Sequence, residues 1–91
     1  MRELFPLGHV VATLGALATL QKAGKEPLAF LQRHARGDWG DLDPEDVQAN
    51  ELALRDGSRL FSAYQVTANV RLWIITESDR SYTTVLLPQE Y

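Results

Sequence analysis

Four polar residues near two turns have the side-chain types that metal-independent cleavage of RNA requires. Such a reaction uses a base, an acid and a cation that stabilises the phosphate in the transition state. His34, Glu77, Arg80 and Tyr82 could supply these groups as catalytic residues. The same residues also fit a structural role, with His34 packed inside the protein and residues 78–81 forming a turn. The sequence does not establish that the four side chains meet in space.

A second group of candidates would bind a partner rather than react. Residues 38–56 hold seven acidic residues and one basic residue, which gives this block a net charge of −6. The block is either a solvated helix face with its caps or an acidic surface for a basic partner. Trp39 is either a plug that closes the core or an exposed anchor. The candidate binding residues are Arg36, Asp38, Trp39, Asp41, Asp46 and Glu51.

The acidic residues do not have the spacing of a metal site. A calcium loop places oxygen ligands at alternating positions, with a glycine in the middle and a late bidentate carboxylate. The order D-W-G-D-L-D-P-E-D from Asp38 to Asp46 differs from that pattern, and Asp43 fits a helix cap instead. The chain has no cysteine, and it contains no phosphate loop or dinucleotide fingerprint. We therefore predict no metal and no cofactor.

Three helices are expected to position these residues. They are predicted over residues 14–23, 27–36 and 44–56, and each is followed by a glycine that can end it. The third helix has the clearest start, because Asp43 is a good N-cap residue and Pro44 suits the first helical position.

After the third helix the hydrophobic period changes from that of a helix to that of a strand. Strands are expected over residues 60–66, 70–77 and 82–87, and Pro88 ends the last one. Residues 10–12 could form a further short strand that leads into the first helix. The fold class predicted is α+β, with N-terminal helices packed on one face of a C-terminal three-stranded antiparallel β-meander.

The length of 91 residues is enough for one domain with a modest core, so a single domain over residues 1–91 is expected. Its helical part would cover about residues 12–57 and its sheet about residues 58–88. The net charge of −3 argues against a generally basic nucleic-acid-binding protein and leaves only a local basic patch for such contacts. The longest apolar stretch, residues 10–20, is shorter than the roughly 20 residues that span a membrane, so we expect a cytoplasmic protein with no membrane contact.

Three stretches of the chain carry a resemblance to a known family. They are R-H-A-R-G-D-W-G-D-L from Arg33 to Leu42, N-E-L-A-L-R-D-G from Asn50 to Gly57, and W-I-I-T-E-S-D-R-S-Y-T-T-V-L-L-P-Q-E-Y from Trp73 to Tyr91. With these stretches the chain resembles, from about Phe5 onward, small uncharacterised bacterial proteins labelled plasmid-related, and sometimes type I restriction subunits. It departs from them at Leu14, where the family has a proline. The resemblance implies an association with mobile genetic elements and brings no established activity.

These observations leave two main hypotheses for function. Small size, the acidic block and the lack of a diagnostic catalytic motif favour a non-enzymatic accessory protein of a plasmid or other mobile element. It would bind a protein partner, for example in host defence. The alternative is a small metal-independent ribonuclease of toxin type, because the order of elements is similar to that of barnase-like and toxin–antitoxin ribonucleases at the level of fold. A third option is a structural homo-oligomer, such as a homodimer, formed through the outer face of the strand over residues 70–77.

Overall fold

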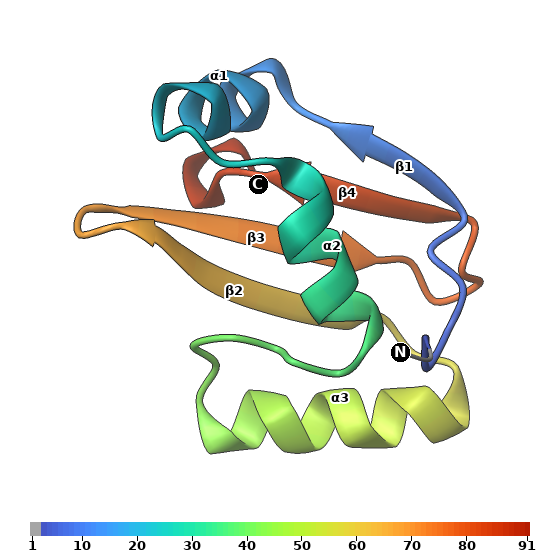
Figure 1. Ribbon diagram of the computed structural model, residues 1–91. Coiled ribbons are helices and arrows are strands. Elements are labelled where there is room, and N and C mark those ends of the chain that lie inside the picture. The colour runs from blue at the N-terminus through green and yellow to red at the C-terminus, as the bar shows by residue number, and fades with distance from the viewer. Residues whose placement is uncertain (1–2) are drawn as a thin grey trace.

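Three α-helices form at the predicted places within residues 3–91, which are the residues that the computed structural model describes (Figure 1). They are α1 (Leu14–Lys22), α2 (Pro27–Ala35) and α3 (Pro44–Asp56). The hydroxyl of Thr13 accepts a hydrogen bond from the amide three residues later, as expected of an N-cap. Gly57 ends α3 in the left-handed conformation that favours glycine, with a φ of 79°. The predicted helix boundaries are therefore confirmed to within one residue.

Four strands of residues 3–91 form one mixed sheet: β1 (His9–Ala12), β2 (Leu60–Thr67), β3 (Val70–Thr76) and β4 (Tyr82–Leu86). Their order across the sheet is β1-β4-β3-β2. The three later strands are antiparallel neighbours, as the meander predicts. β1 pairs in parallel with β4. The α+β class is confirmed, but the prediction of a three-stranded, purely antiparallel sheet is wrong.

The short strand expected over residues 10–12 forms as β1, and its unpredicted place beside β4 has a physical explanation. The amide of His9 donates to the carbonyl of Ser81 at 2.9 Å, and the amide of Thr13 donates to the carbonyl of Val85 at 3.0 Å. Each bond joins the start of the chain to its end, so no turn signal marks the pairing. The whole chain from α1 to β3 forms the long connection between these two parallel strands.

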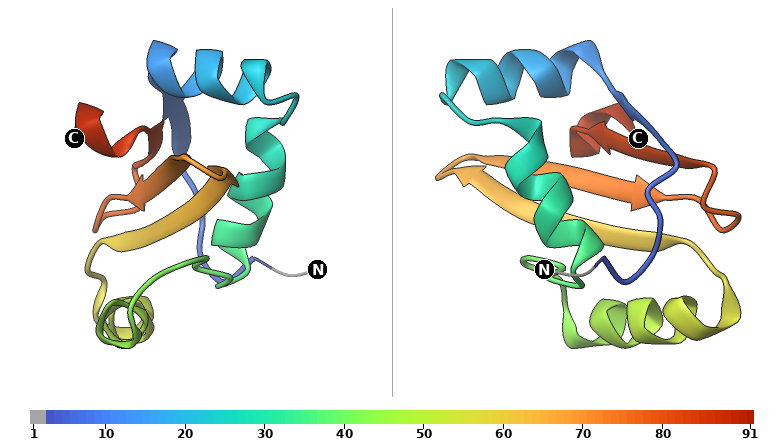
Figure 2. Two further views of the ribbon diagram at one scale, coloured as in Figure 1. Left: turned by 90° about the vertical axis from the view of Figure 1, so that its left-hand side faces the viewer. Right: turned by 45° about the vertical axis from the view of Figure 1, so that its right-hand side comes forward.

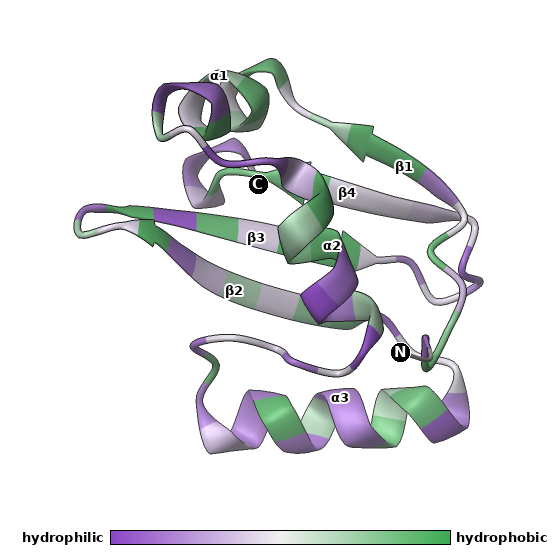
Figure 3. Ribbon diagram, viewed as in Figure 1, coloured by the Kyte–Doolittle hydropathy of each residue, from purple (hydrophilic) through white to green (hydrophobic). Residues whose placement is uncertain are grey.

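One face of the sheet, called the covered face below, packs against α1 and α2 (Figure 2). Alternate residues of the strands point to this face and meet apolar residues of the two helices. α3 lies beside β2 at the edge of the sheet, and apolar and polar residues alternate around it (Figures 1 and 3). The buried residues of the main core are Ala16, Leu20, Phe30, Leu31, Tyr64, Val66, Leu72, Ile74, Val85 and Leu87.

The opposite face, called the open face below, has none of these three helices on it. The pairing of the strands places Phe61, Ile75 and Thr84 in one row across it, and Trp73 in the next row. The 3₁₀ helix η1 (Pro88–Glu90) lies on the side of the sheet away from α2 (Figure 2). None of the helices in the described part of the chain is long and apolar enough to cross a membrane.

Candidate functional site

His34 lies in the interior, on the covered face, with none of its surface exposed. Its Nδ1 atom is 2.5 Å from the hydroxyl of Ser62, and its Nε2 atom is 2.9 Å from the hydroxyl of Thr76. The Thr76 hydroxyl is in turn 2.7 Å from that of Thr83, which donates to the carbonyl of Leu7 at 2.7 Å. His34, a predicted catalytic base, is thus an inner member of a buried chain of hydrogen bonds that runs from Ser62 to Leu7.

The direction of this chain follows from its last member. The Leu7 carbonyl can only accept, so the Thr83 proton points to it and the Thr83 oxygen accepts from Thr76. The Thr76 oxygen is then free to accept from Nε2–H of His34, and the Ser62 hydroxyl donates to Nδ1. Burial lowers the pKa of His34 from 6.5 to about 4, which keeps the ring neutral as this arrangement requires. Both nitrogens of the imidazole are hydrogen-bonded within the core, so neither is accessible to a substrate.

Phe5 is the point around which three conspicuous residues of the sequence meet. Its ring centroid is 5.2 Å from that of His34 and 6.2 Å from that of Trp39, and the Arg80 guanidinium carbon lies 5.8 Å from it. Trp39 is only 4% exposed, and its indole N–H donates to the Glu51 carboxylate. Trp39 therefore closes the core as a plug. The three residues converge through interior contacts and not on a concave surface.

Arg80 binds backbone carbonyl groups with its guanidinium. It donates to the carbonyls of Ala53 at the end of α3 (3.0 Å) and of Ser58 in the loop after it (2.6 Å). It also donates to the carbonyls of Glu77 and Ser78 in its own turn, at 3.1 and 3.2 Å. Arg80 has a φ of 62°, so a left-handed residue forms this turn. The side chain ties α3 to the β3–β4 turn.

The two remaining catalytic candidates lie on the far side of the sheet from His34. Glu77 and Tyr82 directly adjoin Thr76 and Thr83, whose side chains point to the covered face, so their own side chains point the other way. Glu77 lies 3.9 Å from Arg59, and Tyr82 is half exposed. The structure does not bring the four predicted catalytic residues onto one surface.

Asp38, a predicted binding residue, is engaged within the protein. Its carboxylate accepts from Arg33 Nε at 2.7 Å and from the Gly40 amide at 3.3 Å. The Arg33 hydrogen bond holds the pKa of Asp38 below its usual range. The backbone carbonyl of Asp38 accepts from the hydroxyl of Tyr64, whose pKa is raised to about 12 by burial. These contacts fix the loop between α2 and α3.

The other predicted binding residues divide between different places. Arg36 lines a hollow with Glu3, Gln32 and Ala35 that contains none of the other five predicted binding residues. Glu51 accepts the Trp39 indole hydrogen bond. Asp41 and Asp46 are exposed and lie together in one hollow at the border of the open face. Only these last two of the six residues share an accessible surface that also contains apolar side chains.

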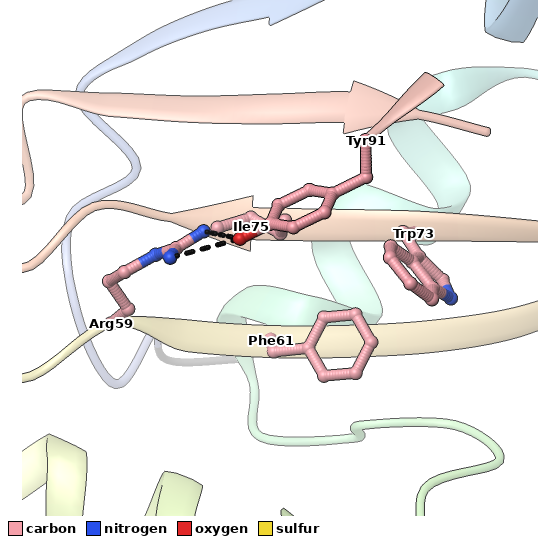
Figure 4. A pocket seen from close by; sticks show the side chains of 5 residues that line it. All are labelled: Arg59, Phe61, Trp73, Ile75 and Tyr91. Atoms are coloured by element: carbon pink, nitrogen blue, oxygen red, sulfur yellow. Dashed lines mark hydrogen bonds between the residues drawn. The ribbon is translucent and has the colours of Figure 1, made fainter. Parts of the chain in front are cut away.

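The feature that the sequence analysis missed is a hollow on the open face, called the aromatic groove below. It is lined by Arg59, Phe61, Trp73, Ile75 and Tyr91 and has a volume of about 330 Å³ (Figure 4). The ring of Trp73 is edge-on to Phe61 at 5.0 Å between centroids, and to Tyr91 at 5.7 Å. The Arg59 guanidinium donates to the Tyr91 hydroxyl from both terminal nitrogens at 3.3 Å. Aromatic walls and an apolar floor thus form a site beside a guanidinium.

A second hollow continues the aromatic groove towards α3. It shares Phe61 and Trp73 with the groove and is also lined by three carboxylates, those of Asp41, Asp43 and Asp46. These three residues, called the acidic end below, lie at the start of α3 and in the loop before it. The acidic block of the sequence therefore meets the open face at this point.

At its other end the aromatic groove is bordered by two more carboxylates. Glu77 and Glu90 line a hollow there that shares Arg59 and Tyr91 with the groove. The Glu90 carboxylate accepts a hydrogen bond from the hydroxyl of Thr13, which lowers the pKa of Glu90 and fixes η1 to the start of α1. Tyr91 follows η1, so this contact holds the last wall of the groove in place.

Sequence periodicity could not reveal the groove by itself. Residues 70–77 are apolar on both faces, which is typical of a strand buried from both sides. The sequence predicts too few helices to cover both faces of the sheet. Because α1 and α2 cover one face, Phe61 and Trp73, which point to the other face, remain accessible. The pairing that places Trp73 next to Phe61 becomes known only from the structure.

No group of three or more side chains that could hold a metal ion occurs within residues 3–91. No protein-family model matches the chain, and comparisons with curated proteins and with solved structures find no significant match. The function must therefore be inferred from the surface itself.

Proposed function

We propose that this protein is a non-enzymatic binding module that holds a protein partner in the aromatic groove. The observation that carries the proposal is the hollow formed by Phe61, Trp73 and Tyr91 on the face that α1, α2 and α3 leave free. Apolar surface gathered in one place and rimmed by polar residues is typical of protein interaction sites. Aromatic residues and arginine, which line this hollow, are also the residue types that contribute most to protein interfaces.

The size of the groove supports a peptide segment as the bound group. Its volume of about 330 Å³ is at the low end of the range for ligand sites, which is about 300–1,000 Å³. A hollow of that size takes one large apolar side chain more readily than an extended cofactor. The shallow hollows at both ends leave room for the neighbouring residues of the same segment.

The charges around the groove indicate the chemistry of that segment. The three carboxylates of the acidic end border it on one side, and Glu77 and Glu90 border it on the other. Two arginines line the same hollows, Arg71 beside the three aspartates and Arg59 beside the two glutamates, so five carboxylates outnumber two guanidinium groups and the net charge is negative. A segment with an aromatic or aliphatic anchor between lysines or arginines fits this pattern, whereas a nucleic-acid backbone would be repelled.

The ribonuclease alternative gains no support from the positions of its residues. His34 is buried on the covered face, and Arg80 donates to carbonyl groups of the protein itself. The setting of the proposal, a plasmid or other mobile element and the cytoplasm of its host, comes from the resemblance of the three sequence stretches and from the lack of a long apolar segment in the sequence.

A peptide-binding experiment tests the proposal. The probes are three immobilised sets of peptides, in which a Leu, Phe or Trp anchor is flanked by lysine and arginine, by serine, or by aspartate and glutamate. We expect retention of the folded protein by the basic set, weaker retention by the serine set and none by the acidic set. An oligo(dT) single strand should not bind.

Two charge-reversal variants with the same change in net charge separate the groove from a general charge effect. Asp41→Lys with Asp46→Lys reverses two of the three charges of the acidic end and should weaken binding to the basic set at least tenfold. Glu26→Lys with Glu45→Lys, at exposed residues that do not line the aromatic groove or its two neighbouring hollows, should weaken it far less. Equal loss in both variants, or no selectivity among the three peptide sets, would contradict the proposal.

A further inference from the structure

The two edges of the sheet differ in how their backbone groups are satisfied. At the β2 edge, the Asn50 side chain forms two hydrogen bonds with the backbone of Phe61, at 2.7 and 3.0 Å. Two residues further along, the Ala63 carbonyl accepts from the Asp41 amide at 2.7 Å, and the Ala63 amide donates to Trp39 at 3.1 Å. Gly40 makes this approach possible with a φ of 76°, where a side chain would collide with the Ala63 carbonyl. The β2 edge is closed by the protein itself at Phe61 and Ala63.

The β1 edge is open. Because His9 and Thr13 donate to β4, the alternation of a strand directs the peptide groups of Val10 and Ala12 to the opposite side. β1 is the outermost strand of the sheet on that side (Figure 1). Two amide donors and two carbonyl acceptors of β1 therefore point outwards, in the arrangement that a further strand would pair with.

The side chains at this edge are apolar and exposed. Val10 is 46% exposed, and the neighbouring residues Leu14 and Leu17 of α1 are 86% and 42% exposed. β1 is also one of the apolar stretches of the ribbon in Figure 3. Edge strands are usually protected by short length, a lysine, a proline or a bulge. β1 is short, with four residues, but it has no lysine, proline or bulge.

We propose that β1 pairs with β1 of a second copy of this protein, antiparallel and across a two-fold axis at Val11, so that two sheets become one of eight strands. In this register Val10 of each copy lies opposite Ala12 of the other. Each such pair exchanges two backbone hydrogen bonds, so all the outward-pointing groups of β1 are used and Val11 faces Val11.

The charges at this edge favour a second copy as the occupant. Residues 10–20 contain no charged side chain, and His9 is the only titratable residue between Glu3 and Gln21. Two chains with a net charge of −3 each can meet here without placing carboxylates opposite one another, which the acidic block would not allow. The outward groups of β1 also complement themselves about Val11, so a two-fold pair leaves none of them unpaired.

The dimer would have a consequence for the open face. A two-fold axis between antiparallel strands is perpendicular to the sheet, so both open faces, with their aromatic grooves, would lie on the same side. Two grooves on one surface could bind two segments of one partner, with the gain in affinity that two linked sites provide. The dimer itself does not depend on what the grooves bind.

Sedimentation equilibrium from micromolar to millimolar protein tests the proposal. The wild type should pass from the mass of one chain to that of two. Val10→Pro removes an outward amide that β4 does not use, and it should raise the dissociation constant by roughly tenfold or more, because two hydrogen bonds per dimer are lost. The matched control Val10→Thr keeps the amide and the branched side chain and should associate like the wild type.

Amide hydrogen exchange of the wild type gives a second measurement that needs no substitution. The amides of Val10 and Ala12 should become more protected as the protein concentration rises, while the amide of Gln65 on β2 should not change. A mass of one chain at every concentration overturns the proposal. Binding of β1 to a strand of another protein would not rescue it, because the proposed partner is a second copy of this chain. Association that is unaffected in a folded Val10→Pro variant, with unprotected Val10 and Ala12 amides, overturns it as well.

Discussion

On the covered face of the sheet a histidine and three hydroxyl side chains are fully buried and hydrogen-bonded, whereas on the open face large aromatic rings line a hollow. His34, Ser62 and Thr76 belong to the first set, and Phe61 and Trp73 to the second. The residue types that usually perform catalysis are thus inside the protein. The types that usually fill a core are partly accessible to solvent.

The contrast teaches that burial and hydrogen-bond partners, and not residue type, show where this protein can interact. A buried polar group costs stability unless it has partners, and each member of the His34 chain has them. Burial of apolar surface stabilises a protein or a complex by about 25 cal/mol for each Å² removed from water, and exposed apolar surface lacks this stabilisation. A partner that covered the aromatic groove would recover part of that free energy.

The largest effect should come from removing the centre of the buried chain. His34→Ala would leave the Ser62 and Thr76 hydroxyls with fewer partners and would open a cavity beneath Phe5. Both effects reduce the free energy of unfolding, together by about 4 kcal/mol. Urea unfolding measures it, and Tyr82→Ala on the exposed side should change the same quantity by less than about 0.5 kcal/mol. Similar losses in the two variants would remove the distinction between the faces.

Acidification should produce the next largest effect. The folded protein keeps His34 neutral with a pKa of about 4, against an ordinary value of 6.5. Below about pH 6.5 the unfolded chain therefore binds a proton that the folded chain excludes, and stability falls until about pH 4, by about 3 kcal/mol in total.

Unfolding free energies measured across that range test this dependence. The pKa values of Asp38, Asp79 and Glu90 are lowered, so the stability that they contribute is lost at more acidic pH, as their own folded-state pKa values are approached. His34→Gln should therefore flatten the curve between about pH 6.5 and about pH 5, above the range in which these carboxylates titrate. A slope that persists in His34→Gln would show that another group titrates there.

Arg80 should contribute less than His34, because part of its surface is in contact with solvent. Arg80→Ala removes the donors to the carbonyls of Ala53 and Ser58 and should lower the free energy of unfolding by about 2 kcal/mol. Arg80→Lys should restore only part of it, since an ammonium group cannot span carbonyls from two segments in the same way. Full stability of Arg80→Ala would show that the clamp between α3 and the β3–β4 turn is dispensable.

Local signals in the sequence were sufficient for much of the fold. The N-cap Thr13, the proline that begins α3 and the glycine after α3 place the helices, although the Asp43 side chain forms no capping hydrogen bond. The change of period after Gly57 places the meander. The position of β1 in the sheet was not predictable in this way, because its hydrogen bonds join residues at opposite ends of the chain. Pairing between distant segments leaves no mark in a local pattern.

The candidate site was less predictable for a related reason. The residue types around His34 and Arg80 suggested chemistry, but their contacts with Ser62, Thr76 and backbone carbonyls exist only after folding. The acidic block was recognisable from composition. Its residues at the start of α3 line a hollow with Trp73, and this proximity depends on how α3 packs beside β2.

Trp73 gives the sharpest comparison of the two faces. Trp73 and Ile74 are neighbours in β3 and point to opposite faces of the sheet. Trp73→Ala removes the contacts with Phe61 and Tyr91 and should cost about 2 kcal/mol of unfolding free energy, about 1 kcal/mol for each aromatic pair. Ile74→Ala, at a fully buried position, should cost about 3 kcal/mol. Retention by the basic peptides should reverse this order, because Trp73→Ala removes a wall of the groove while Ile74→Ala leaves the groove intact in the molecules that remain folded. If the folded Trp73→Ala variant is retained as well as the wild type, the open face is not where the partner binds.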